Sequence, residues 1–272
     1  AHRLKGVVAD LEGAVDVSQL QVRIGDVATK SQTILEASTH PVIMGLMSKY
    51  LGSSFRCATL SSNTLIQQDG GDSKDTGLGW HVDYPYHDIE QRFWPPSDQP
   101  LGCQALFCLN EFTACNGGTL FRTGTHGLLD IPKYAFDTPA PTSTDDGRPI
   151  ACEQLGRLPP PEARPHEFSV DPNITKYHDC PAGSVLLAHA AWWHRQVRNL
   201  GPSSGPEEIS NRRAALLGNY TPGHVVPKDD MRGQYEAIRA QGWQLTGRVK
   251  EVVEDTYLGK RQDDGKRRGI PE

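Results

Sequence analysis

The chain has 272 residues, 37% of them hydrophobic, which suffices for one sizeable core or two modest ones. A formal net charge of −5 provides no basic field for nucleic acid, and no apolar run approaches the roughly 18 residues of a membrane span. The six cysteines form no C-x-x-C pair and are too few for a disulfide-stapled scaffold. We therefore expect reduced thiols in an intracellular protein, cytoplasmic or organellar. The chain begins with Ala1 rather than Met and has no apolar signal-peptide core, which leaves open whether a targeting segment has been lost.

The first part of the chain, residues 1–54, is expected to be helical. Residues 26–35 have the pattern of a short helix, and a second helix is predicted over residues 41–51, where apolar side chains share one face. Pro41 near its start and Gly52 just past its end match the usual asymmetry of helix termini.

Short strands replace helices over residues 55–220. Asn116-Gly117-Gly118 is a turn of the kind that joins hairpin strands, and the strand around Phe107 is apolar enough to be buried. We predict strands over residues 55–68, 79–84, 103–112, 119–121, 183–189, 191–198 and 212–220.

Residues 137–179 are a poor strand candidate because they contain many prolines, including the run at 159–161. A connection this long without regular structure is usually functional or mobile. We interpret it either as an insertion that covers the mouth of a site or as a plain surface excursion. Residues 221–272 are expected to supply a helix near 228–240 and a charged tail.

This order of elements predicts the fold class. Many short strands flanked by helices, without β-α-β alternation, are typical of a mainly β protein built as a double-stranded β-helix, or jelly roll. We expect residues 1–272 to form a single domain.

A metal site is predicted by Trp80-His81-Val82-Asp83. On a strand, His81 and Asp83 point to the same face, about 6–7 Å apart. A second histidine from another strand, His194, would complete the two-histidine, one-carboxylate set that binds non-haem Fe(II) and leaves positions open. His189 competes with His194 for this role, and either histidine could instead be a core residue bonded to the backbone.

Arg212 and Arg213 suggest an anion site, because alternation on a strand turns one of them inward. A buried arginine needs an anionic partner. A dicarboxylate held bidentately would supply one, and an acidic side chain is the alternative.

Taken together, these motifs resemble the phytanoyl-CoA dioxygenase family of Fe(II)- and 2-oxoglutarate-dependent oxygenases. The order of the motifs is more specific than any one of them. The matching segments are Gly79-Trp80-His81-Val82-Asp83, Asn116-Gly117-Gly118-Thr119-Leu120 with Gly124-Thr125-His126, Pro181-Ala182-Gly183-Ser184-Val185-Leu186-Leu187 with Trp193-His194, and Asn211-Arg212-Arg213-Ala214.

The resemblance implies roles for particular residues. His81, Asp83 and His194 would bind the iron, and Arg212 would bind the distal carboxylate of 2-oxoglutarate. Arg213 is the fallback, because the gap from His194 to Arg212 (212 − 194 = 18 residues) is longer than the family leads us to expect. Further co-substrate contacts are expected from Thr64, Gln67 and Thr119, and substrate contacts from Trp80, Tyr84 and Trp193, of which Trp193 could equally be a core residue.

The resemblance also implies an activity. We expect O2-dependent hydroxylation of a C–H bond in a small organic or lipid-like molecule, with release of succinate and CO2. Asp83 stands where related halogenases have a small residue, which favours hydroxylation, with desaturation and ring formation as the other oxidative outcomes. The alternatives are a metal-dependent hydrolase or isomerase on a cupin-like barrel, and a jelly-roll binding protein without catalysis. A small-molecule partner is expected, and the sequence gives no oligomeric state.

Overall fold

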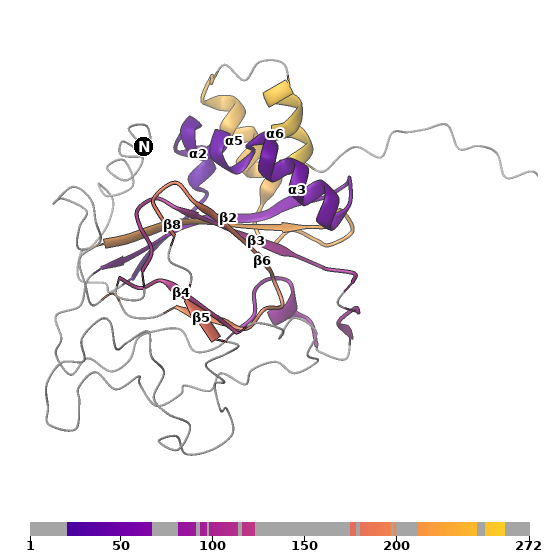
Figure 1. Cartoon of the computed structure of the whole chain (residues 1–272). Helices are drawn as coiled ribbons and strands as arrows, with labels where there is room; N and C mark the ends of the chain where they lie inside the picture. Colours follow the sequence, from indigo (N-terminus) through magenta and orange to yellow (C-terminus); the bar gives the residue numbers. More distant parts are fainter. Residues whose placement is uncertain are drawn as a thin grey trace, which may run out of the picture.

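Two antiparallel sheets face one another, and a layer of helices covers the outer side of the larger sheet (Figure 1). The computed structural model describes residues 21–66, 81–90, 93–96, 98–113, 116–122, 175–177, 180–196, 199, 212–243 and 248–258. No helix within these ranges is long and apolar enough to cross a membrane.

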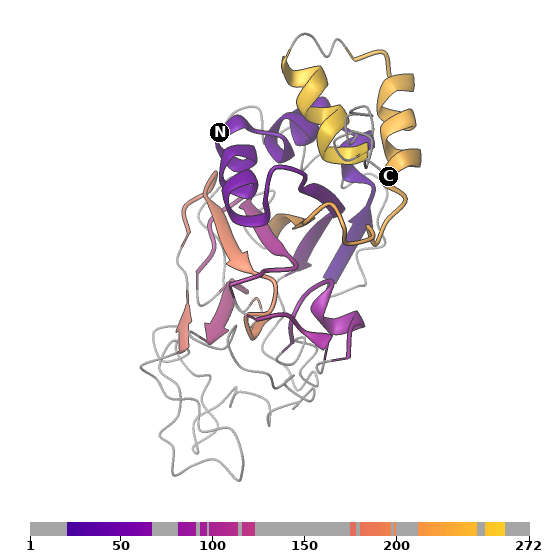
Figure 2. The same cartoon turned by 90° about the vertical axis from the view of Figure 1, so that its right-hand side faces the viewer.

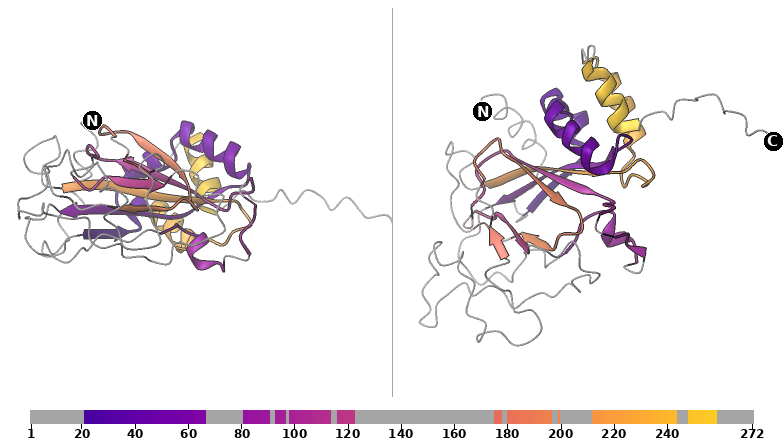
Figure 3. Two further views of the ribbon diagram at one scale, coloured as in Figure 1. Left: turned by 60° about the horizontal axis from the view of Figure 1, so that its bottom comes forward. Right: turned by 45° about the vertical axis from the view of Figure 1, so that its right-hand side comes forward.

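The larger sheet has the strand order β1-β2-β8-β3-β6, with every neighbouring pair antiparallel. Its strands are β1 (Gln21–Gly25), β2 (Arg56–Ile66), β3 (Cys103–Cys108), β6 (Val185–His189) and β8 (Arg212–Thr221). The smaller sheet has the order β5-β4-β7. It consists of β4 (Thr119–Arg122), β5 (Thr175–Tyr177) and β7 (His194–Gln196). Figure 3 shows the resulting layers of helices, larger sheet and smaller sheet from two further directions.

Strand β8 separates the core from the cavity. Its even-numbered side chains, such as Leu216 and Tyr220, are buried in the core beneath the helices. Its odd-numbered side chains Arg213, Leu217 and Asn219 line a cleft between the sheets. This division follows from the two-residue period of a strand.

The helical layer consists of α2 (Gln32–Ser38), α3 (Pro41–Leu51), α5 (Met231–Ala240) and α6 (Arg248–Leu258), together with the 3₁₀ turn η1 (Val27–Thr29) (Figure 2). Helix α3 begins with Pro41, and the His40 side chain accepts a hydrogen bond from the Val42 N–H. These features satisfy the first turn of the helix. The Tyr220 hydroxyl donates to the Ser38 carbonyl over 2.6 Å, which ties the sheet to α2.

The jelly roll, the helix at 41–51 and the strands at both ends of the core agree with the sequence predictions. The predicted helix at 26–35 is divided instead into η1 and α2, because Asp26 is left-handed (φ 54°) and Ser31 is extended. The predicted strand at 79–84 is reduced, among its described residues, to a single bridge at His81. Most of segment 137–179 lies outside the described residues, although β5 falls within it. The single domain stays a prediction.

Candidate metal centre

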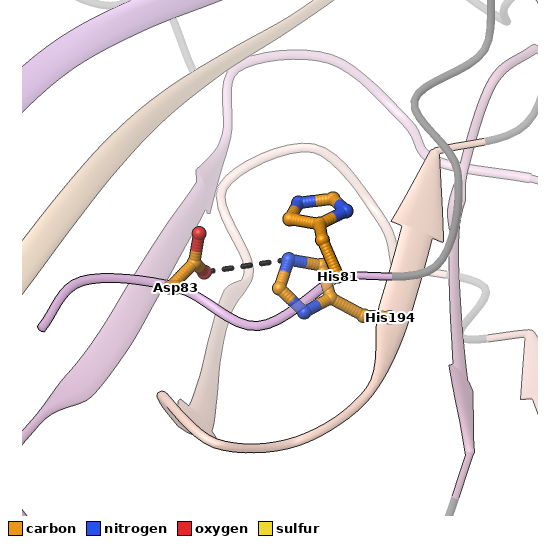
Figure 4. A group of neighbouring side chains, drawn as sticks. All are labelled: His81, Asp83 and His194. Carbon is orange, nitrogen blue, oxygen red and sulfur yellow. Dashed lines mark ion pairs between the residues drawn. The ribbon is translucent and has the colours of Figure 1, made fainter. Parts of the chain in front are cut away.

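His81, Asp83 and His194 converge between the two sheets (Figure 4). Reciprocal backbone hydrogen bonds of 3.0 Å join His81 to His194, and the Asp83 N–H donates to the Ala190 carbonyl over 2.8 Å. One potential ligand atom from each of the three side chains lies within 4.8 Å of the other two. The predicted triad is therefore assembled by backbone pairing rather than by a continuous strand.

The orientation of the His194 ring is set by its surroundings. Its Nδ1 lies 3.0 Å from the Trp192 carbonyl oxygen, and Phe121 stacks against the ring at a centroid distance of 5.6 Å. A proton on Nδ1 would donate to that carbonyl and leave the Nε2 lone pair directed at Asp83. This is the arrangement in which a histidine binds a metal through one nitrogen and is oriented through the other.

The chemistry of these donors fits a divalent cation. The His194 Nε2 and the Asp83 Oδ2 approach to 3.3 Å, yet Oδ2 is buried and has no hydrogen-bond partner among the described residues. With His194 neutral and protonated on Nδ1, two lone pairs face one another there. A cation between them would satisfy both, and two imidazoles with one carboxylate suit Fe(II).

The triad lines a cleft that encloses about 590 Å³, including its opening to solvent. Polar side chains dominate the remaining lining, and most of them come from the larger sheet. Besides the triad, the cleft is lined by Arg23, Asn63, Gln104, Leu106, Thr119, Gln196, Arg213, Leu217 and Asn219.

Arg213 supplies a buried cation to this cleft. The residue is only 1% exposed, and its guanidinium lies 4.6 Å from the centre of the Phe112 ring. Burial lowers the pKa of Arg213 to about 10, although the nearby Cys108 opposes this shift. No ion pair within the described part of the chain joins Arg213 to an acidic side chain, and its Nε has no hydrogen-bond partner there.

Arg212, the first choice of the sequence prediction for the co-substrate, points away from the cleft. It belongs to the even-numbered face of β8 and pairs in register with Ile66. Thr64 is likewise on the helix side, because it pairs with the core residue Ala214. Among the predicted co-substrate contacts, Thr119 and Arg213 line the cleft, and Gln67 lies outside the described residues.

The predicted substrate contacts are placed elsewhere. Trp193 is buried in a separate apolar cluster with Val82, Tyr86 and Trp94. The Tyr84 hydroxyl donates to the Val226 carbonyl, and Tyr84 does not line the cleft. Trp80 lies outside the described residues.

His189, the competitor of His194, is absent from the triad. Its Nδ1 accepts a hydrogen bond of 2.9 Å from the Ala191 N–H, and its ring packs edge-on to Tyr50. Backbone bonding of this kind is the role of a core histidine.

The sequence prediction missed several polar residues of the cleft. Asn63, Gln104 and Asn219 are each at most 6% exposed, and Gln104 is the one polar residue of the otherwise apolar strand β3. A polar residue isolated in a buried strand was the available signal, because buried polar groups require partners. Asn219 also shares the parity of Arg213 and hence its face.

Comparison with known proteins bears on the family and the fold. The model of the family named phytanoyl-CoA dioxygenase (PhyH) matches residues 11–204. No curated protein matches the chain significantly.

Solved structures share the fold. SnoN, a non-heme alpha ketoglutarate dependent epimerase from nogalamycin biosynthesis, is 18% identical with a TM-score of 0.51, over 81% of this chain and 72% of its own. HygX from Streptomyces hygroscopicus, crystallised with nickel, 2-oxoglutarate and hygromycin B, is 14% identical with a TM-score of 0.51, over 84% of this chain and 81% of its own. At these identities the likeness establishes the fold, and it confirms the predicted jelly roll.

Proposed function

Because the chain belongs to the phytanoyl-CoA dioxygenase family, we propose that it is an Fe(II)- and 2-oxoglutarate-dependent oxygenase. His81, Asp83 and His194 hold the iron, and Arg213 binds the co-substrate. One observation carries this proposal. The metal triad and a buried arginine, which has no acidic partner among the described residues, line the same cleft.

Arg213 is suited to the distal carboxylate of 2-oxoglutarate. A guanidinium binds a carboxylate through two parallel hydrogen bonds, and such bonds are strengthened away from water. The Phe112 ring under the guanidinium keeps it in place. Thr119, 6% exposed on the opposite sheet, offers a hydroxyl from the other wall of the cleft.

The chain contributes ligation, orientation and exclusion of water. The two histidines and Asp83 occupy one side of the metal and leave the other side to ligands. Phe121 is fully buried between His194 and Trp192, with which it makes a ring contact at 5.8 Å, and so shields the imidazole from solvent. When bound, Fe(II) supplies the activation of O2 that is coupled to oxidative decarboxylation of 2-oxoglutarate.

We propose hydroxylation of a C–H bond in a small molecule as the reaction. Support comes from the third ligand. Asp83 fills with a carboxylate the position that a halide would otherwise need, and its backbone is fixed by the Ala190 carbonyl.

The test is an anaerobic titration of the metal-free protein with Fe(II) and 2-oxoglutarate. The visible charge-transfer band of the chelated keto acid is expected in the wild type and is expected to be lost in His81→Ala and Asp83→Ala. His224→Ala, which changes an exposed histidine, serves as the matched control and keeps the band. Iron binding without the band in the wild type would refute the proposal and leave the hydrolase and binding-protein alternatives.

A further inference from the structure

Two primary amides lie side by side on the wall of the cleft. Gln104 on β3 and Asn219 on β8 are register partners, so their side chains emerge next to each other. They are 5% and 6% exposed, and both line the cleft. The Oε1 of Gln104 and the Oδ1 of Asn219 are buried and have no hydrogen-bond partner in the described part of the chain.

Such a pair is costly to the folded protein. A buried polar group without a partner loses its hydration and receives nothing in exchange. Structural amides avoid this cost, as the buried Asn116 does by accepting from the Thr113 N–H over 2.8 Å and donating to the Glu111 carbonyl over 2.6 Å. Two adjacent amides left open toward a cleft are therefore suited to hydrogen-bond a ligand.

The amides are far from the proposed co-substrate arginine. Arg213 and Asn219 are six residues apart on β8, which corresponds to about 20 Å along an extended strand. The carboxylate that Arg213 would hold is therefore distant from both amides. The metal lies nearer to the amides, because Asp83 bonds to Ala190, and Ala190 bonds in turn to Gly102, two residues before Gln104.

We propose that Gln104 and Asn219 form a substrate-recognition pair, and that the substrate is a neutral, hydroxyl-rich molecule of the sugar or polyol class. A primary amide both donates and accepts, and a hydroxyl group does the same, so adjacent hydroxyls can satisfy both amides. A hydrocarbon chain would leave both amides unpaired, and a carboxylate would leave both carbonyl oxygens unpaired. This substrate class rests on the oxygenase function proposed above. It replaces the lipid-like molecule that the sequence also allowed as a substrate.

The first part of the test needs no substrate. Gln104→Met and Asn219→Leu replace each amide with an apolar side chain of similar size. Because neither amide oxygen has a hydrogen-bond partner in the described part of the chain, the melting temperature is expected to stay equal or to rise. The matched control, Gln234→Met, removes an amide that donates a hydrogen bond to Asp26, and it should lower the melting temperature. A decrease in the two cleft variants as large as in the control would overturn the proposal.

The second part measures binding by ligand-observed NMR to protein loaded with Zn(II) and 2-oxoglutarate. The probes are myo-inositol and methyl glucoside, compared with hexanol. We expect a polyol to bind the wild type and to bind each cleft variant at least tenfold more weakly, because each variant loses a buried hydrogen-bonding partner. A wild type that binds 2-oxoglutarate but neither polyol, or variants that bind both polyols unchanged, would overturn the proposal.

The titration with 2-oxoglutarate separates this failure from that of the proposed function. Gln104→Met and Asn219→Leu are expected to bind 2-oxoglutarate like the wild type, since the amides are distant from the arginine that would hold its distal carboxylate. A wild type that does not bind 2-oxoglutarate contradicts the oxygenase assignment itself.

Discussion

Neighbouring residues on β8 have opposite roles. Arg213 is buried in the cleft and has no acidic partner in the part of the chain that the structure describes, whereas Arg212 lies on the other face of the strand. A buried cation without a counter-ion destabilises a fold unless it binds an anion. Arg213 thus represents a stability cost that a bound dicarboxylate would offset.

Replacing Arg213 should therefore separate stability from binding. In Arg213→Met, we expect 2-oxoglutarate affinity to decrease by about 100-fold or more through the loss of two charge-assisted hydrogen bonds. The melting temperature of the metal-free protein should rise by a few degrees, because an unpaired buried charge is removed. Calorimetric titration and thermal unfolding measure the two effects. Arg212→Met is the control, and a greater loss of affinity in that variant would reverse the assignment.

The elements around the metal approach each other closely. A Cβ added to Gly102 would lie 2.9 Å from the Ala190 Cβ and 3.0 Å from the Tyr84 carbonyl oxygen. Both neighbours belong to segments that position Asp83, since Ala190 accepts the Asp83 N–H and Tyr84 follows Asp83 directly. The lack of a side chain at Gly102 permits the metal-bearing segment to pack on the start of β3.

We accordingly expect Gly102→Ala to weaken Fe(II) binding by about 10- to 100-fold, the usual effect of disturbing the support of a metal ligand. Gly45→Ala provides a matched control in helix α3, where a Cβ would meet nothing within 4 Å. It should stabilise the protein by about 1 kcal/mol and leave iron affinity unchanged. Titration with Fe(II) in the presence of a competing chelator measures the iron affinity of both variants. Equal iron affinity in the two variants would contradict the role given to Gly102.

The sequence predicted which three side chains lie together better than it predicted the elements that carry them. His81, Asp83 and His194 could be named because their residue types and spacing suit iron. The strand expected at 79–84 is only a bridge at His81 among its described residues, since the segment turns into the 3₁₀ turn η2 (Tyr86–Asp88). The conformation of this segment is determined by its pairing with a strand that is distant in the sequence. Such pairing cannot be predicted from the local pattern of residues.

The choice between faces of a strand was also beyond the sequence. Thr64 was expected to contact the co-substrate, but Asn63 is the β2 residue that lines the cleft. A shift of one residue in register exchanges the two faces. The same limit applies to Arg212 and Arg213. Only the pairing of β8 with β2 and β3 shows which of the two arginines faces the cleft. Helix α6 was missed because its charged residues resemble those of a solvated tail.

At the scale of the whole molecule, the larger sheet divides stability from function. Its helix side contains the apolar core with Tyr220, and its other side forms the polar cleft with Asn219. Substitutions on the two faces should thus have different consequences even at adjacent positions.

Tyr220→Phe tests the core face. It removes a buried hydrogen bond of 2.6 Å to the Ser38 carbonyl and leaves that face otherwise unchanged. We expect a loss of about 1–2 kcal/mol in the free energy of unfolding, measured by urea denaturation, with unaltered 2-oxoglutarate affinity. A changed affinity with intact stability would show that the two faces are coupled.

The cysteines of the core should report global unfolding. Burial raises the pKa of the Cys57, Cys103 and Cys108 thiols to about 12 each. A raised thiol pKa keeps these groups protonated near pH 8, and the thiol form is unreactive toward alkylation. We expect iodoacetamide to modify them only in denaturant, as followed by mass spectrometry with peptide mapping. Rapid modification of Cys103 in the native protein would indicate local opening of β3.

The unequal lengths of the two sheets have a consequence for assembly of the site. Strands β2 and β8 run for 11 and 10 residues, whereas β4 and β7 run for only four and three. Amide hydrogens of short strands exchange with solvent through local opening, while those of long central strands exchange only on global unfolding. Because iron would bridge the end of β7 to the segment of His81 and Asp83, loading the metal should slow hydrogen exchange in β7 and leave β8 unchanged. The larger sheet then forms a wall of the cleft that is stable without the metal. The wall formed by the smaller sheet becomes stable only when the metal is bound.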